Sequence, residues 1–503
     1  MRFGVDAQPS WVHRSSFLFA LCVVPFIVLA TLNAGGYRYG ASDQAFYVPA
    51  TLLQLDPELF PRDAAVLTAQ THLTSIDEMI AAVVRLTGAS LPAIFATLYV
   101  AALVLLAWSL WRLGNRMYQS AWTAVALLAA FTLRHAIARS GTNTLEGYFH
   151  PRVMAFALGA TALMFFLRTR VAAPLALVVV AFFVHPTTGL WFIVWLTVAM
   201  GIGHPVLRRY VVAAFVLGAV VAAWMLTAGP LAGRLAIMDA DWRQMLASKD
   251  YLFPMEWPAY AWIINLGYLP VVAWIYQERV RAGLVDRFER ALVLGSSSLA
   301  IIFAGALVSH VIGVTLAVQL QPARVFWMFD TLAVIYAVWF LAEGGWSSAF
   351  RRAGPQLLVL LLLCFSSIRG VYVLMETARP AFQFALPDDD WGRAMAFARG
   401  TEKHSGWLAD PLHAVLYGTS LRVAGERDVF VEAVKDAAIG MYDRSIAVRT
   451  TRRLAAISDF KTLSAAEARK LAAEYDLDFM ITEQQMALPL AFESGRLRVY
   501  RLE

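Results

Sequence analysis

Apolar stretches about as long as a bilayer is thick are the feature of this sequence that most constrains its fold. They recur along most of the 503 residues, and only 16% of the chain is charged, against about 25% in a typical soluble domain. The mean hydropathy is +0.59. A run of about 20 apolar residues matches the hydrocarbon core of a membrane. The sequence therefore predicts a polytopic α-helical membrane protein and excludes an ordinary soluble enzyme.

The apolar runs divide into about eleven predicted transmembrane helices. We place them at 17–34, 91–111, 121–133, 153–167, 172–184, 189–203, 211–228, 259–276, 291–318, 325–343 and 356–374. The run 172–184 is short for a span, and 291–318 is long enough to tilt or break. The first run is also compatible with a signal peptide, but its long amino-terminal region favours an uncleaved helix.

Arginines orient these spans. With the amino terminus in the cytoplasm, every short cytoplasmic loop carries at least two of them, such as Arg112 and Arg116. This distribution follows the positive-inside rule. An odd number of spans then places the tail outside. We predict a multi-pass protein of the plasma (inner) membrane, with a transmembrane domain at 1–375 and a small extracytoplasmic α/β domain at 376–503.

The tail and two long outer loops are the expected non-membrane parts. An amphipathic helix at 465–475 and strands at 477–482 and 496–502 are predicted in the tail. The first outer loop is 35–90. The second, 229–258, combines acids with aromatic residues, which suits a loop that contacts headgroups or sugars and equally suits an aromatic belt at the membrane surface.

Several functions lack support. The net charge of +6 comes without a basic stripe, so we predict no nucleic-acid partner. Cys22 and Cys364 both lie in apolar runs, which argues against a disulfide framework or a cysteine metal site. The sequence has no motif for nucleotide hydrolysis, hydride transfer or zinc-protease chemistry. A donor substrate at the outer face is therefore most simply a lipid-linked one.

Ionisable groups in or beside the spans fall on the extracytoplasmic half of this topology. A charge within a membrane is costly, so its position is informative. The groups are Arg134, His135, Glu146, His150, Arg152, His185, His310, Arg324, Asp330 and Arg369. Any one of them is explained by snorkelling to headgroups, and Asp330 by a structural ion pair. Because snorkelling populates both ends of spans, we expect the groups to converge on one polar cavity with Asp43 of the first loop.

Asp43 lies just above the membrane in an aromatic segment that includes Tyr39 and Tyr47. A carboxylate in such a place is suited to accept a proton from a sugar hydroxyl. The alternative is a turn or helix-cap aspartate.

Two helix starts are candidate phosphate sites. Pro151 suits a first helical turn, and His150 and Arg152 beside it would make that helix start an anion site. The alternative is an ion pair between Glu146 and Arg152. At the segment that begins with Gln321, Arg324 is suited to clamp a phosphate or, alternatively, a lipid headgroup.

His185 and Pro186 join two apolar runs with almost no loop. Irregular backbone at such a depth usually lines a cavity, because unpaired backbone groups are not tolerated in lipid. A tight hairpin explains the segment about as well.

Taken together, these segments resemble the GT-C superfamily of integral membrane glycosyltransferases. The resemblance is carried by Asp43 within 39–44, the loop 35–90, and the tail with its ending at 479–483 and 498–502. Three further segments look like those of poorly characterised bacterial members: 146–152, 185–186 and 321–324.

The resemblance implies a polyprenyl-phosphate-linked sugar as donor, membrane lipids around it, and inverting transfer to an acceptor at the outer face. Asp43 would be the general base. The expected substrate-binding residues are Glu146, His150, Arg152, His185, Gln321 and Arg324, with Glu146 orienting the acceptor or a cation.

No cofactor is required by the sequence, although a divalent cation is compatible with the family. Many members have an acidic pair in the first loop, whereas Gln44 follows Asp43 here, so Asp56 or Asp63 is the candidate second acid. Two other functions stay open. A transporter or flippase for a lipid-linked or anionic solute predicts inverted halves and charges at the midplane, and a non-catalytic assembly factor would use the tail to bind a partner.

Overall fold

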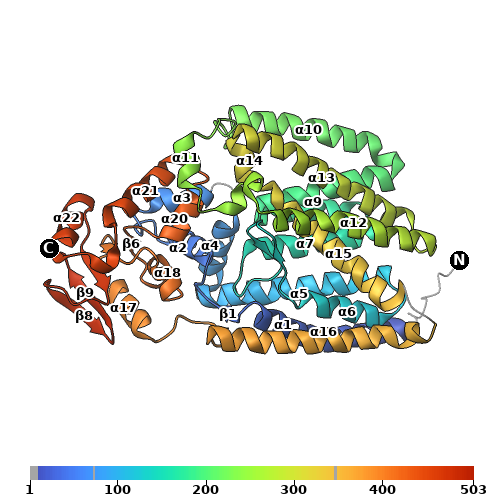
Figure 1. Cartoon of the computed structure of the whole chain (residues 1–503), viewed down its shortest axis with the longest axis horizontal. Helices are drawn as coiled ribbons and strands as arrows, with labels where there is room; N and C mark the ends of the chain where they lie inside the picture. The colour runs from blue at the N-terminus through green and yellow to red at the C-terminus, as the bar shows by residue number, and fades with distance from the viewer. Residues whose placement is uncertain (1–9, 72–73, 345–347, 503) are drawn as a thin grey trace.

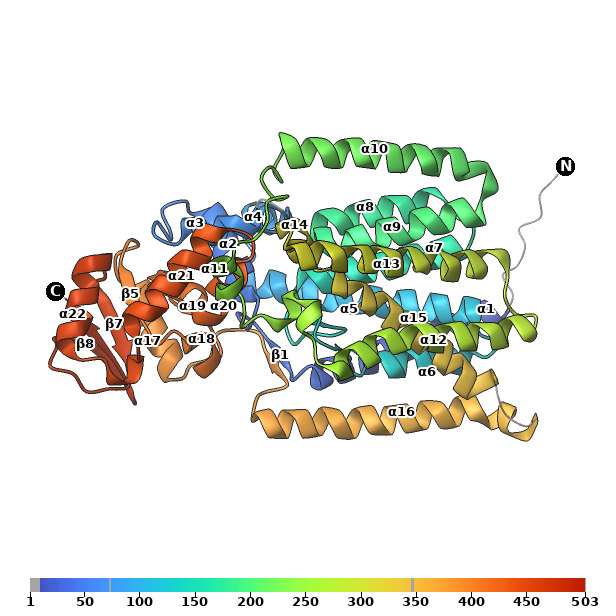
Figure 2. The same ribbon diagram turned by 45° about the horizontal axis from the view of Figure 1, so that its top comes forward.

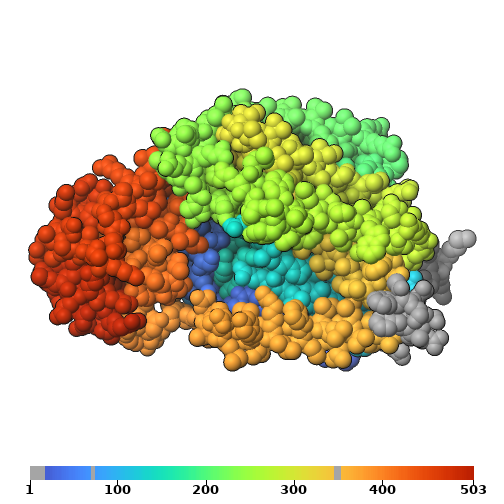
Figure 3. All heavy atoms as spheres, viewed as in Figure 1, coloured from blue at the N-terminus to red at the C-terminus, as the bar shows by residue number. Residues whose placement is uncertain are grey.

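The computed structural model describes residues 10–71, 74–344 and 348–502. A bundle of long helices forms one part of the molecule, and a smaller domain that carries the main sheet covers one end of the bundle (Figure 1). In the space-filling view of Figure 3, the small domain packs directly against the bundle.

Every predicted apolar run contains a helix. These helices are α1 (Ser10–Asn33), α5 (Leu91–Met117), α6 (Ala121–Phe131), α7 (Pro151–Leu167), α8 (Ala172–Val184), α9 (Pro186–Gly203), α10 (Arg208–Thr227), α12 (Ala259–Arg281), α13 (Arg287–Ile312), α15 (Val325–Trp339) and α16 (Ser348–Thr377). Within the described residues, seven helical segments are long and apolar enough to cross a membrane, and four apolar helices are shorter. The chain is therefore a helical membrane protein.

The long run predicted at 291–318 breaks. Helix α13 ends at Ile312, Gly313 takes a positive φ of 85°, and the short helix α14 (Thr315–Leu320) follows. Glycine suits this position because it has no Cβ to oppose the left-handed conformation. The 3₁₀ turn η4 (Pro322–Arg324) then leads into α15, so the chain re-enters the bundle through an irregular segment.

The most completely buried helices of the bundle are α6, α7 and α15, and α10 and α16 lie at its outer sides (Figure 2). The hairpin between α8 and α9 is tight: a Cβ on Gly189 would come within 2.3 Å of the Phe182 backbone. Helix α10 buries none of its residues. An apolar helix with no buried face is what a lipid-facing span presents.

The first loop folds over the end of the bundle. It contains β1 (Tyr37–Arg38), α2 (Gln44–Leu55), α3 (Ala64–Thr71) and α4 (Ile76–Thr87). Strand β1 pairs in parallel with β4 (Phe382–Gln383), which follows α16.

Close approach of the chain makes this pairing possible. At Gly36, φ is +82°, and a Cβ there would lie 2.6 Å from the Pro380 carbonyl oxygen. The first loop is thus joined to the chain that leads into the tail.

The tail is an α/β domain, as its pattern predicts. Its sheet has the order β6-β5-β7-β9-β8, with β5 parallel to β6 and β7, and β9 antiparallel to β7 and β8. The strands are β5 (Gly406–Leu408), β6 (Asp428–Val429), β7 (Phe479–Thr482), β8 (Leu490–Ser494) and β9 (Leu497–Arg501). The helices are α17 (Asp390–Arg399), α18 (His413–Leu416), α19 (Leu421–Ala424), α20 (Ala433–Ile439), α21 (Arg444–Ile457) and α22 (Ala465–Tyr475).

A buried ionic cluster joins the first loop to the tail. Arg422 is 1% exposed and donates from Nε to Asp63 at 2.7 Å and from Nη1 to Asp436 at 2.6 Å. Asp63 also accepts from Arg449 and, at 3.0 Å, from the Val429 amide. These contacts hold the first loop and the tail together as one cap on the bundle.

The second loop contributes to the same cap through α11 (Ala240–Met245) and the turns η2 (Asp250–Leu252) and η3 (Pro254–Glu256). Trp242 donates from Nε1 to the Gly440 carbonyl oxygen at 2.8 Å, and Asp239 pairs with Arg444 at 2.6 Å. The acids and aromatic residues of this loop therefore serve, in part, to dock the tail.

Candidate functional site

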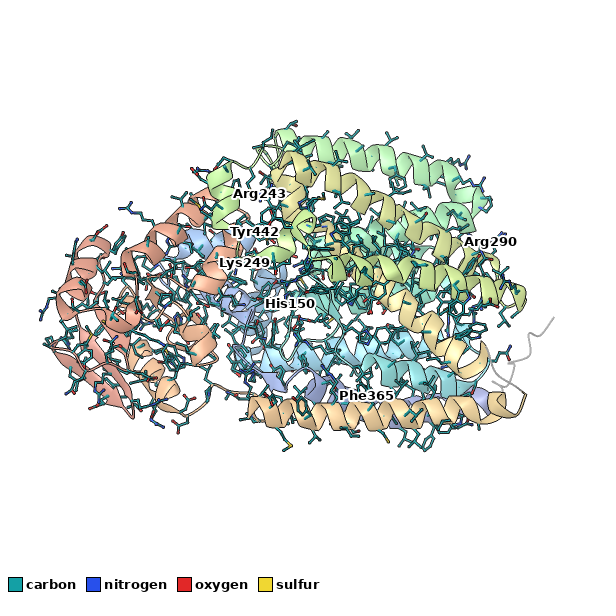
Figure 4. The ribbon with its side chains drawn as sticks, viewed as in Figure 1. His150, Arg243, Lys249, Arg290, Phe365 and Tyr442 are labelled. Atoms are coloured by element: carbon teal, nitrogen blue, oxygen red, sulfur yellow. The ribbon has the colours of Figure 1, made fainter. Side chains whose placement is uncertain are left out.

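A cavity of about 240 Å³ lies where the bundle, both long loops and the tail meet. Figure 4 shows His150, Lys249 and Tyr442 at this junction. The cavity is lined by six of the seven predicted site residues, namely Asp43, His150, Arg152, His185, Gln321 and Arg324. They come from segments that are far apart in the sequence.

Three proline-initiated helix starts bring these side chains together. Pro151 begins α7 after His150, Pro186 begins α9 after His185, and Pro322 begins η4 after Gln321. Proline suits a first helical position because its missing N–H needs no partner there. The positive ends of α7 and α9 meet at the cavity and favour an anion.

His150 caps α7 and contacts Asp43. Its Nδ1 accepts from the Arg152 amide at 3.0 Å, and its Nε2 lies 3.2 Å from Asp43 Oδ2. Burial, and then the charge of Arg152, lower the pKa of His150 to about 3. The neutral ring therefore carries its proton on Nε2 and donates it to Asp43.

Asp43 is an ionised carboxylate held at the cavity wall. Lys435 Nζ lies 2.6 Å from Oδ1, the Tyr148 hydroxyl lies 3.4 Å from Oδ2, and the side chain is 29% exposed. Burial acts to raise the pKa of Asp43, but Lys435, His150 and Arg152 outweigh it and hold that pKa well below its usual range. Asp43 occupies the N-cap position of α2, as the helix-cap alternative supposed, but its side chain makes no cap hydrogen bond and contacts Lys435 and His150 instead.

The two arginines carry buried donors without acceptors. Arg152 is 3% exposed and donates from Nη2 to Glu146 at 2.9 Å, while its Nε has no hydrogen-bond partner. Arg324 donates from Nη1 to Thr187 at 3.4 Å, and its Nε is likewise buried and unpaired. Buried donors are nearly always satisfied in proteins. These two are placed to meet the oxygens of an anionic ligand.

Glu146 lies outside the cavity lining, contrary to its predicted role in orienting an acceptor or a cation. It contacts Arg152 at 2.9 Å and Arg134 at 3.6 Å and is 6% exposed. The ion-pair alternative therefore describes it. By accepting from Arg152, Glu146 fixes the guanidinium that faces the cavity.

Sequence reasoning missed the residues that the second loop and the tail supply. Lys249, Tyr251, Lys435 and Tyr442 line the cavity, and Lys249 donates to the Val434 carbonyl oxygen at 3.0 Å. A signal was present, since the chain has only five lysines and two of them lie here. The signal was not used because ionisable groups were sought in and beside the predicted spans, and Lys249 and Lys435 lie outside them.

Other predicted members of the cluster lie elsewhere. His135 Nδ1 forms a hydrogen bond with Asp330 Oδ2 at 2.9 Å, so Asp330 has a structural partner, as the alternative for it supposed. Arg369 donates to the Asn33 side chain at 2.7 Å. Within the part of the chain that the structure describes, both ring nitrogens of His310 are buried and unpaired, away from the cavity lining. Among the predicted ionisable groups, those that line the cavity therefore stand at or beside helix starts.

The donor set does not fit a resident divalent cation. Asp43, His150 and His185 are the metal-ligating side chains among the lining residues, and Asp43 is already paired with a lysine. Among the described residues, no group of three or more histidine, cysteine, aspartate or glutamate side chains is arranged so that it could hold a metal ion. The candidate second acids are also placed elsewhere: Asp56 pairs with Lys403 at 2.7 Å, and Asp63 is buried in the Arg422 cluster.

The cavity therefore has one carboxylate facing four cationic side chains, two of which have unsatisfied donors. This arrangement can bind a phosphate and place a base beside it. No protein-family model matches the chain, and no curated protein matches its sequence.

Proposed function

We propose that this protein is an integral membrane glycosyltransferase that moves a sugar from a polyprenyl-phosphate donor to an acceptor at the extracytoplasmic face. One observation carries the proposal: an ionised aspartate shares a cavity with a surplus of cations, among them two arginines with buried, unpaired donors. In this proposal all eleven apolar helices cross the membrane, the amino terminus is cytoplasmic, and the tail is extracytoplasmic.

The donor phosphate binds Arg152, Arg324 and Lys249 at the amino ends of α7 and α9. Guanidinium groups suit a phosphate because they present several donors in a fixed plane. His150 and His185 are neutral caps in this arrangement, so they orient neighbouring groups rather than adding charge. The polyprenyl chain extends from the phosphate toward the apolar bundle.

Asp43 is the general base of the transfer. The acceptor hydroxyl oxygen attacks the anomeric carbon from the side opposite the phosphate, and its proton passes to an Asp43 carboxylate oxygen. The bond between the anomeric carbon and the phosphate oxygen breaks, and the polyprenyl phosphate leaves with the electron pair. The arginines stabilise the negative charge that develops on it. The acceptor hydroxyl displaces Lys435 from Oδ1, which raises the basicity of Asp43 as its nearest cation moves away.

Conversion of the donor lipid tests the proposal. Purified protein in nanodiscs is mixed with a lipid extract of its source membranes, and mass spectrometry follows sugar-charged and free polyprenyl phosphate. The wild type converts the first into the second. Asp43→Asn should abolish the conversion, because an amide cannot take the proton, and Arg496→Gln serves as the control because Arg496 is an 83% exposed side chain of the tail. Sugar-charged lipid that stays unchanged with wild-type protein would overturn the enzyme proposal.

A further inference from the structure

A second cavity, of about 220 Å³, lies on the other side of Lys435. Its lining includes Arg38, Ser42, Arg379 and Glu432, and it shares Val434 and Lys435 with the first cavity. The neighbouring residues Ser42 and Asp43 thus line different cavities. Lys435 stands between them, because its Nζ lies 3.5 Å from Ser42 Oγ and 2.6 Å from Asp43 Oδ1.

The backbone at this partition is unusual. Ser42 has a φ of +51°, a left-handed conformation that non-glycine residues rarely adopt. Such strain persists where surrounding structure enforces it, and it often marks functional segments. Here it occurs at the residue between the two cavities.

The charges of the second cavity are not balanced. Among the described residues, neither Arg38 nor Arg379 pairs with a carboxylate, and Arg38 Nε is buried without a hydrogen-bond partner. Burial, and then the like charge of Arg379, lower the pKa of Arg38 to about 10. Arg38 is half-buried and Arg379 is exposed at the mouth of the cavity, and two such guanidinium groups without a carboxylate partner can bind an anion together.

An unsatisfied acceptor faces the same space. Glu432 is 1% exposed; its Oε2 accepts from Ser420 at 2.6 Å, and its Oε1 is buried without a partner. A ligand hydroxyl could donate to Oε1 and so satisfy this buried acceptor. The cavity therefore offers donors for an anionic group and an acceptor for a hydroxyl.

We propose that the second cavity binds the acceptor, and that the acceptor carries an anionic group, a phosphate or a carboxylate, together with hydroxyls. Arg38 and Arg379 hold the anionic group, and Glu432 accepts from one hydroxyl. Another hydroxyl reaches past Lys435 to Asp43. This inference rests on the proposed function, because it takes the first cavity as the donor site.

Anion titration tests the site itself. Inorganic phosphate is titrated by calorimetry into the full chain in nanodiscs of neutral lipid. Two sites are expected in the wild type. Arg38→Gln should weaken one of them at least tenfold, Arg152→Gln should weaken the other, and Arg496→Gln should leave both unchanged. If Arg38→Gln retains both sites at wild-type affinity, the second cavity is not an anion site.

Competition identifies the form of the ligand. Glycerol 1-phosphate is added in solution, and phosphatidylglycerol is added to the nanodiscs, each against phosphate bound in the Arg152→Gln protein. Displacement by the soluble compound alone supports a soluble acceptor, and displacement by the lipid supports an acceptor carried on a headgroup. Displacement by neither would contradict a site for hydroxyl-bearing anions.

The co-purifying lipid then tests the acceptor assignment. Loss of acceptor binding should make Arg38→Gln retain polyprenyl phosphate that still carries its sugar, at a higher fraction than the wild type, whereas Arg152→Gln should retain neither form. An unchanged fraction in Arg38→Gln would overturn the assignment. If the wild type holds no polyprenyl phosphate at all, the proposed function fails instead, while the phosphate titration still decides the anion site.

Discussion

Two groups of charges are built in opposite ways, one inside the cap and one in the cavity between the cap and the bundle. Around Arg422, the two nearest carboxylates, Asp63 and Asp436, lie at 2.7 and 2.6 Å, and all three side chains are almost completely buried. In the first cavity, Arg152 and Arg324 keep unpaired donors. A buried charge needs partners to be tolerated. The paired group therefore holds the structure together, whereas the second group keeps free hydrogen-bond donors that a ligand can use.

The largest expected effect is on the paired group. Arg422→Met leaves Asp63 and Asp436 without their shared cation, and loss of one partner of a buried pair costs about 3–5 kcal/mol. We expect a large fall in the melting temperature of the cap. The measurement is tryptophan fluorescence during heating, to which the buried Trp391 and Trp407 of the tail contribute. If Arg422→Met melts together with the Arg496→Met control, the cluster is not the structural centre of the cap.

The matching change in the second group should leave stability unchanged and remove binding. Arg324 has no carboxylate partner among the described residues, since its side-chain hydrogen bond is with Thr187. Arg324→Gln therefore leaves no buried carboxylate without its cation. We expect wild-type melting and about a tenfold or greater loss of phosphate affinity at the first cavity, since a charged hydrogen bond is worth about 1.5–3 kcal/mol. A strongly destabilised Arg324→Gln protein would remove the contrast between the two groups.

Acid should break the Asp43 contacts only at low pH. Because the pKa of Asp43 is depressed in the folded protein, these contacts stabilise the fold above the unfolded pKa of about 3.9 and are lost as the pH falls through the folded value. The difference in melting temperature between wild type and Asp43→Asn should thus be constant from about pH 8 to 5 and shrink below about pH 4. A difference that already shrinks between pH 8 and 6 would contradict an ionised, cation-held Asp43.

The smallest effect is expected at His150. With a pKa of about 3, its ring stays neutral through the physiological range, so donor conversion should show no acid limb near pH 6.5. His150→Gln keeps an acceptor and a donor and should retain part of the activity, whereas His150→Ala loses the cap, at a cost of about 1 kcal/mol. Equal activity of the two variants would argue against the orienting contact with Asp43.

Much of this architecture follows from local patterns. Apolar runs predict the helices, and helix α22 forms over the predicted residues 465–475. The proline-initiated starts at His150, His185 and Gln321 are also readable, because proline and a polar residue before an apolar run mark a helix beginning. Five of the six predicted residues that line the cavity follow from that reading, and Asp43 follows from its place in the aromatic first loop.

What escaped prediction depends on tertiary docking. Lys435 reaches Asp43 only because α20 packs over the first loop, and no local pattern encodes a contact between residues 392 positions apart. Asp63 was a candidate second acid because Gln44 follows Asp43 where many members of the family that the chain resembles have an acidic pair; burial against Arg422 gives Asp63 a structural role instead. His135 likewise takes a partner, Asp330, that only the folded chain reveals, whereas the pairing of Glu146 with Arg152 was one of the two alternatives that the sequence left open.

The central claim is that Arg152 and Arg324, whose buried Nε groups have no hydrogen-bond partner, hold a lipid-linked phosphate in the first cavity. Native mass spectrometry of the full chain, released from membranes in mild detergent, tests it most directly. The account predicts bound polyprenyl phosphate on the wild-type protein and on Arg496→Gln, and its loss from Arg324→Gln and Arg152→Gln. Equal amounts of that lipid on all four proteins, or none on the wild type, would contradict it.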